Sequence, residues 1–151
     1  IKTLHILSSV LLVGTGFGTA FYLFFANRTG NIAAIAAVSK LVVRADLWFT
    51  TPAVIFQPLS GLWLAHIAGW HWTTPWLSLS IGLYLLAGVC WLPVVWLQYE
   101  MAKMAAQAHS GGAAALPARY WRFAAWWERL GYPAFLAMVA VYFLMVVKPA
   151  L

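Results

Sequence analysis

The chain has 151 residues, of which 64% are hydrophobic and 8% are charged, and its mean hydropathy is +0.84. A soluble domain carries about a quarter charged residues, so this composition excludes a water-soluble globular protein and indicates an integral membrane protein. The net charge of +6 does not favour nucleic-acid binding, because the basic residues lie between apolar segments where they orient a membrane protein. The single cysteine, Cys90, excludes a disulfide framework within the chain.

Four apolar segments are long enough to cross the roughly 30 Å of hydrocarbon, which takes about 20 residues of helix. They cover residues of about 3–26, 41–69, 76–104 and 120–147, and we expect one transmembrane domain over 1–151. The first segment holds 24 uncharged residues, too long for the apolar region of a signal peptide, so we expect a retained helix. The sequence therefore predicts an all-α, four-helix membrane bundle.

The basic residues predict the orientation of this bundle. Seven of the nine lie on the side of the first and third loops: Arg28, Lys40, Arg44, Lys103, Arg119, Arg122 and Arg129. Only Lys2 and Lys148 lie on the other side, next to the tryptophan-rich turn at 69–75. Since basic loops stay in the cytoplasm, we expect both termini to face away from it, an N-out/C-out topology.

Small residues and prolines predict how the helices pack. Gly14 and Gly18 form a small-xxx-small pair, which favours close helix–helix packing over a ligand role. Prolines 52, 58 and 93 should each remove a backbone hydrogen bond and kink a helix, with nearby Thr and Gln side chains compensating. Arg44 and Asp46 lie near the cytoplasmic end of the second helix, where an interfacial ion pair is the favoured interpretation.

Two histidines are candidate haem ligands. His5 lies near the start of the first helix and His66 near the end of the second, so antiparallel helices bring them to the same membrane level. Ser9, Leu12 and Gly16 share a helix face with His5, and Leu62 shares one with His66. An axial pair for haem b between these helices is one interpretation, and two unrelated interfacial histidines are the other.

Cationic groups near the outer face complete the candidate site. Lys2, Lys148 and His71 could neutralise the propionates of a haem bound at this depth. His71 lies between Trp70 and Trp72, which favours an interfacial role over a third ligand or a quinone contact. The metal ligands predicted are thus His5 and His66, with the other residues as cofactor contacts.

The same residues resemble a known family. The segments 2–7 (KTLHIL), 46–61, 91–93 (WLP) and 144–149 (LMVVKP) together are similar to the small bacterial integral membrane proteins catalogued as domain of unknown function 2269. This resemblance implies a multi-pass protein of the bacterial inner membrane. It also implies kinship with copper-resistance D-type proteins and with four-helix haem proteins that act as protoporphyrinogen oxidases. The histidine of those haem proteins matches His5, but their Pro-Arg-Leu motif is replaced by Ala26-Asn27-Arg28.

Three functions follow as hypotheses. The first is a haem b-binding electron-transfer protein, for which a reduced-minus-oxidised spectrum should show sharp b-type bands. The second is a membrane oxidoreductase acting on porphyrinogen or quinol, with Arg44, Asp46, Gln57 and Trp48 as candidate pocket residues. The third is a copper-handling or accessory subunit without haem, in which Met138 and Met145 on one helix face would contribute. Beyond the lipid bilayer, the partners left open are quinone or quinol, a second copy and a partner subunit.

Overall fold

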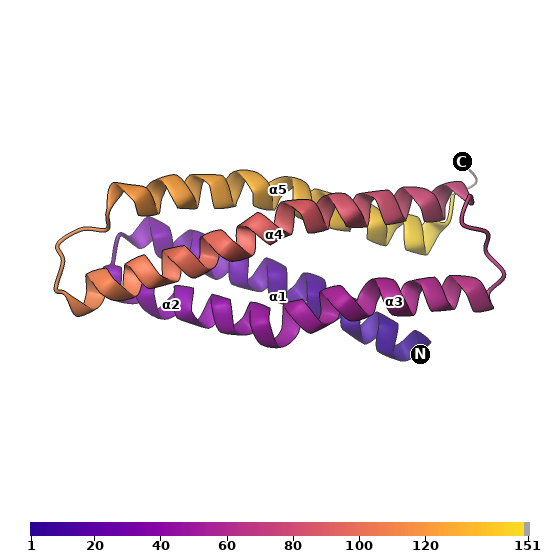
Figure 1. The fold of residues 1–151 in the computed structure, drawn as a ribbon, viewed down its shortest axis with the longest axis horizontal. Coiled ribbons are helices and arrows are strands. Elements are labelled where there is room, and N and C mark those ends of the chain that lie inside the picture. The colour runs from indigo at the N-terminus through magenta and orange to yellow at the C-terminus, as the bar shows by residue number, and fades with distance from the viewer. Residues whose placement is uncertain (150–151) are drawn as a thin grey trace.

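The computed structural model describes residues 1–149 as a bundle of four long helices (Figure 1). The first, third and fourth are α1 (Lys2–Thr29), α4 (Pro75–Ser110) and α5 (Ala118–Val147). The second is built from α2 (Ile32–Ala45), a π-helical turn η1 (Asp46–Thr50) and α3 (Thr51–Ile67), and the backbone stays right-handed helical at both junctions. The predicted all-α bundle is confirmed.

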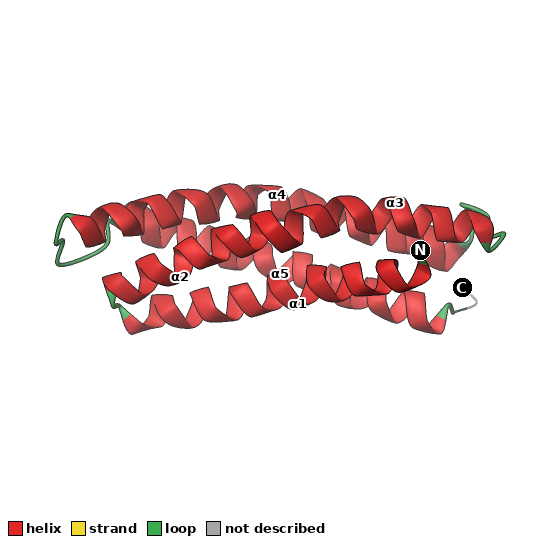
Figure 2. Ribbon diagram, turned by 90° about the horizontal axis from the view of Figure 1, so that it is seen from below, coloured by secondary structure: helices red, strands yellow, loops and turns green. Residues whose placement is uncertain are grey.

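Successive helices run antiparallel (Figures 1 and 2). The N-terminus, the end of α5 and the α3–α4 turn lie at one end, while the α1–α2 and α4–α5 loops lie at the other. The most extensive helix packing is between α4 and α5, and α2 packs on α4. By contrast, α3 packs on α1 rather than on α4. The bundle is therefore tight at the end with two loops and looser at the end with the termini.

The outer surface is suited to lipid rather than water. Many large apolar side chains are exposed on every long helix, among them Leu4, Val10, Leu47, Trp48, Leu92, Leu136 and Val146. Three helices, α1, α4 and α5, are each long and apolar enough to cross a membrane. The second helix consists of α2, η1 and α3, with 14, 5 and 17 residues. Each of the three is shorter than a full membrane span, but together they form one continuous helix.

The helix ends extend beyond the predicted segments. Residues 27–29, expected in a loop, belong to α1, which ends where Gly30 adopts a left-handed φ of 66°. Asn31 then caps α2 by accepting a hydrogen bond from the backbone N–H of Ala34. Asn27 is buried, and the Tyr120 hydroxyl donates to its side-chain oxygen at 2.6 Å. The predicted helix ends at about residue 26. The buried hydrogen bond between Asn27 of α1 and Tyr120 of α5 instead stabilises Asn27 within the helix.

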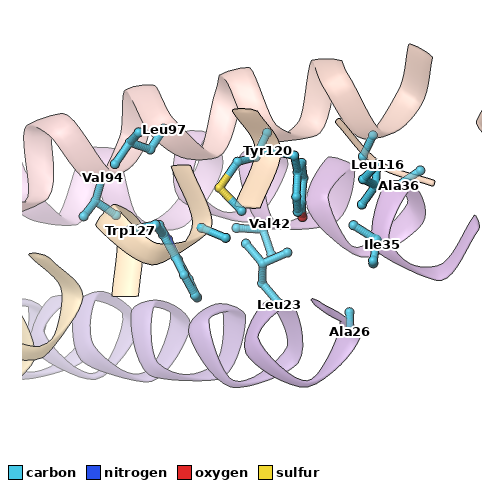
Figure 3. Close-up of a cluster of buried hydrophobic side chains, with 13 residues drawn as sticks. Leu23, Ala26, Ile35, Ala36, Val42, Val94, Leu97, Leu116, Tyr120 and Trp127 are labelled. Atoms are coloured by element: carbon cyan, nitrogen blue, oxygen red, sulfur yellow. The ribbon is translucent and has the colours of Figure 1, made fainter. Parts of the chain in front are cut away.

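The main core fills the end that carries the two loops (Figure 3). Leu23 of α1, Val42 of α2, Leu97 of α4 and Trp127 of α5 all belong to this cluster, so every long helix contributes. A second, smaller cluster lies towards the termini and comprises Ala65, Trp76, Leu77 and Leu144. Between the two clusters the packing is incomplete, and this gap positions the candidate site.

The glycines of α1 do not mediate close helix packing. A Cβ placed on Gly14, Gly16 or Gly18 would meet no neighbouring atom within 4 Å. The close-packing interpretation of Gly14 and Gly18 is therefore wrong, because no other helix approaches that side of α1 closely enough. The glycine that does permit a close contact is Gly61 of α3, where a Cβ would lie 3.1 Å from the His5 ring.

One proline has a compensating partner on a neighbouring helix. Pro58 lacks the N–H that would bond the carbonyl of Val54 four residues earlier, and α3 continues through it. The Tyr84 hydroxyl of α4 donates to that carbonyl at 2.7 Å. Because lipid offers no alternative donor, this contact satisfies a carbonyl that would otherwise remain unpaired. It also joins α3 to α4 in the half of the bundle where their backbones diverge.

Replacing Tyr84 by Phe should lower the free energy of unfolding by about 1–2 kcal/mol, because the Val54 carbonyl loses its donor. The measurement is unfolding of the purified protein in mixed micelles. In a Pro58→Ala background the restored N–H should remove most of this cost. Tyr22→Phe, at an exposed tyrosine on α1, is the matched control. An equal cost with and without Pro58 would contradict the assignment.

Candidate functional site: an intramembrane cavity

A cavity of about 380 Å³ lies between the two hydrophobic clusters, at mid-height in the bundle. All four long helices line it: α1 through Leu12 and Gly16, η1 through Asp46 and Thr50, and α4 and α5 through the residues described below. Its walls are mostly apolar. Pockets that bind small molecules in proteins measure about 300–1,000 Å³ and combine apolar walls with a few polar groups, so the size and character agree with a ligand site.

The polar part of the cavity is centred on Asp46. Asp46 is 5% exposed, and its carboxyl group accepts a hydrogen bond of 2.8 Å from the Thr50 hydroxyl, one turn along η1. The Gln98 amide of α4 lies beside the same carboxyl group. The side-chain oxygen of Gln98 is buried and has no hydrogen-bond partner in the described part of the chain. An unpaired acceptor thus lies next to a carboxyl group inside the bundle.

The π-helical turn accounts for the inward orientation of the Asp46 and Thr50 side chains. The Thr51 N–H bonds to the Asp46 carbonyl five residues back, so this turn holds one residue more than an α-helical turn. The turn ends two residues before Pro52, which cannot donate a hydrogen bond. The predicted ion pair between Arg44 and Asp46 is wrong, because Arg44 is exposed while Asp46 is buried and bonded to Thr50.

Aromatic side chains form much of the cavity wall. Phe17 of α1 and Phe135 of α5 stack with ring centroids 5.2 Å apart, bridging two helices whose backbones do not pack closely. Both rings line the cavity and both are partly exposed on the outer surface. Trp91 and Tyr132 add further aromatic wall from α4 and α5. The Phe17–Phe135 pair therefore forms part of the cavity wall between α1 and α5.

His5 lies outside this cavity and is held by α3. Ser60 donates its proton to the carbonyl of Phe56, so the Nδ1–H of His5 is the donor in the 2.8 Å contact with the Ser60 oxygen. The His5 Nε2 atom is then the acceptor for the Gln57 amide at 3.2 Å. This places the Cε1 edge of the ring against Gly61 and engages both nitrogens with one neighbouring helix.

His66 does not join His5 at a shared site. It follows Gly61 by five residues, which turns its side chain about 140° around α3 from the face that contacts His5. His66 is exposed, and so are Leu59 and Ile55 on its face, at 64% and 60%. This face belongs to the outer surface of the bundle and does not form the wall of a haem pocket between α1 and α3. The donor set therefore does not fit a bis-histidine haem between these helices.

The other predicted contacts are dispersed. Leu12 and Gly16 line the cavity, whereas Ser9 bonds to the carbonyl of Ile6 within its own helix. The remaining predicted contacts are Leu62, half-buried on α3, and Lys2, exposed at the start of α1. His71 is exposed in the α3–α4 turn and bonds to Thr73 at 2.7 Å. Lys148 lies over the rings of Trp70 and Trp76, each 5.7 Å away, a cation–π contact at the end that carries the termini.

The residues proposed for an enzyme pocket and those proposed for copper binding also do not gather at one site. Of the four proposed pocket residues only Asp46 lines the cavity, because Gln57 contacts His5 while Arg44 and Trp48 are exposed. Met138 lines the cavity, but Met145 packs against the smaller apolar cluster. Within residues 1–149 no group of three or more His, Cys, Asp or Glu side chains could hold a metal ion.

The sequence reasoning missed Gln98 and Tyr84. A polar amide within an otherwise apolar span is the signal that could have identified Gln98, since such residues in membrane helices generally face the interior. Tyr84 could have been found only by asking what satisfies the carbonyl left free by Pro58. Neither its partner nor its distance follows from spacing along the chain.

Long apolar helices with many large apolar side chains on the outer surface define an integral membrane helical bundle. The family model described as "Predicted integral membrane protein (DUF2269)" matches residues 1–149, and the chain belongs to that family. The resemblance to it is thereby confirmed. No curated protein and no solved structure matches the chain.

Replacing each histidine by Leu should distinguish their environments. His5→Leu removes the partner of Ser60 and Gln57 inside the bundle and should cost about 1–3 kcal/mol of unfolding free energy. His66→Leu, at an exposed position, should stay within about 0.5 kcal/mol of wild type. Unfolding in mixed micelles measures both. Equal, large losses at the two positions would indicate a shared structural site and contradict this assignment.

Proposed function

We propose that this membrane protein binds a lipid-soluble small molecule with a hydroxyl-bearing ring, of the quinol class, in the mid-bundle cavity. The observation that carries the proposal is the polar group formed by Asp46, Thr50 and Gln98 in the wall of a mostly apolar cavity of about 380 Å³. A ligand hydroxyl that hydrogen-bonds to these side chains would be stabilised in a cavity that otherwise offers mostly apolar contacts.

The cavity walls support a flat ring with an apolar tail. Aromatic rings prefer offset or edge-to-face contacts, and Phe17, Trp91 and Phe135 offer such surfaces from three helices. Asp46, Thr50 and Gln98 form one polar group of lining residues on η1 and the middle of α4, and Glu128 and Tyr132 add polar atoms from α5. A ligand would therefore be oriented with its hydroxyl towards Asp46 and Gln98 and with its tail along the aliphatic and aromatic walls.

Entry from the lipid follows from the position of the aromatic pair. Phe17 and Phe135 contact each other through rings alone, while the backbones of α1 and α5 stay apart. Side-chain rotation at two partly exposed rings requires no movement of a packed helix, since exposed rotamers exchange in picoseconds to nanoseconds. A hydrophobic ligand would reach the cavity laterally, without passing through water.

Replacing Gln98 by Leu should weaken binding of a short-tailed benzoquinol probe by roughly ten-fold, equivalent to about 1.4 kcal/mol. Titration of the probe into purified protein, followed calorimetrically, gives the dissociation constant. Gln107→Leu, at an exposed glutamine near the end of α4, is the matched control and should bind as wild type does.

A second variant fills the cavity without changing its polar groups. Gly131 of α5 lines the cavity, and a Cβ there meets no atom within 4 Å. Gly131→Leu should therefore fold and yet exclude the probe. Unchanged probe binding in both Gln98→Leu and Gly131→Leu would refute the proposal.

The haem b hypothesis stays a prediction with its own test. The contacts of His5 with α3 and the exposure of His66 do not favour it, so we expect the purified protein to show no b-type bands. A reduced-minus-oxidised spectrum measures this directly. Sharp b-type bands that disappear in both His5→Ala and His66→Ala would instead establish the haem function and overturn our expectation.

A further inference from the structure

A second hollow, which we call the α2–α4 groove, lies at the end of the bundle with the two loops. It has a volume of about 700 Å³ and is lined by residues of α2 and α4 alone. Four cationic or titratable basic side chains lie along it: Lys40, Arg44, Lys103 and His109. We infer that this groove binds the headgroup of an anionic phospholipid.

Within residues 1–149 the basic side chains of the groove have no acidic partner. The one ion pair in residues 1–149 joins Arg28 of α1 to Glu128 of α5 at 3.5 Å, away from the groove. Asp46, two residues from Arg44, is buried and bonded to Thr50, and Glu100, three residues from Lys103, does not line the groove and forms no ion pair within the described residues. Lys40, Arg44 and Lys103 are exposed and are therefore available to an external anion.

The floor of the groove suits a lipid rather than a free ion. Five alanines line it between the basic side chains: Ala33, Ala36, Ala37, Ala102 and Ala106. Small side chains leave room for a glycerol backbone and the first methylenes of an acyl chain, while the basic groups contact the phosphate. A free phosphate would use the charges and leave this apolar floor uncovered.

The depth of the groove agrees with the headgroup level. Because α2 begins and α4 ends at the same end of the bundle, His109 and Ala33 lie near that end, and Arg44 and Tyr99 lie deeper. Long basic side chains at such positions extend towards the interface, and basic pockets between helices are known sites for anionic headgroups. Positive-inside anchoring alone would spread these charges around the bundle and would not require a shared hollow.

The test follows the thermal unfolding midpoint of the full chain in non-ionic detergent as lipid is added. Phosphatidylglycerol should raise the midpoint, whereas phosphatidylcholine and inorganic phosphate at equal concentration should not. The Lys40→Gln/Lys103→Gln variant should require roughly ten-fold more phosphatidylglycerol for the same rise, since each surface charge contributes a measurable share of headgroup attraction. Arg119→Gln/Arg122→Gln, with the same charge change on α5, should respond as wild type does.

Two further results decide between the groove and general charge attraction. Ala106→Trp fills the groove without altering its charge and should abolish the response to phosphatidylglycerol. Equal responses of the two double variants, or an unchanged response of Ala106→Trp, would overturn the inference. A full response to inorganic phosphate would also overturn it, because the site would then bind a free anion.

Discussion

The hydrocarbon of a membrane offers no hydrogen-bond partner, so each polar group inside this bundle depends on another helix or on its own. The carbonyl of Val54, freed by Pro58, is satisfied by the Tyr84 hydroxyl. The His5 ring is satisfied by two side chains of α3. Six buried polar atoms in the described residues lack a hydrogen-bond partner, and of their residues Gln98 is the one that lines the cavity. The candidate site thus combines a cavity with a polar side chain that the bundle satisfies only in part.

The main core and the mid-bundle cavity both result from the way the helices diverge along the bundle. The main core joins all four helices at one end, where α2 approaches α4 and the hydroxyl of Tyr120 reaches Asn27. Towards the termini, α3 follows α1 while α4 follows α5, and the space between the two pairs is bridged by side chains rather than by backbone contact. A rigid end beside a looser middle allows a ligand to enter without unfolding the bundle.

The fold could be predicted from the sequence because apolar length and composition alone determine a membrane helix. The four segments and their antiparallel order followed from this. The candidate site could not be predicted, since its geometry depends on how each helix is rotated about its own axis. The His5–His66 hypothesis placed both residues at one level, yet it could not show that α3 presents Gly61 and Ser60 to His5 while His66 points outward. The inward position of Asp46 likewise depends on a π-helical turn that spacing does not reveal.

The central claim is that a lipid-soluble ring binds between α1, η1, α4 and α5 at the level of Asp46. The most direct measurement is photo-crosslinking with an azido-quinone in lipid nanodiscs, followed by mapping of the labelled peptides. We expect labels concentrated at residues 12–25 and 127–138, which line the cavity, and lost in the presence of excess unlabelled quinol. Labels spread over the outward-facing positions such as Trp48, Leu92 and Val146, and insensitive to competitor, would contradict the account.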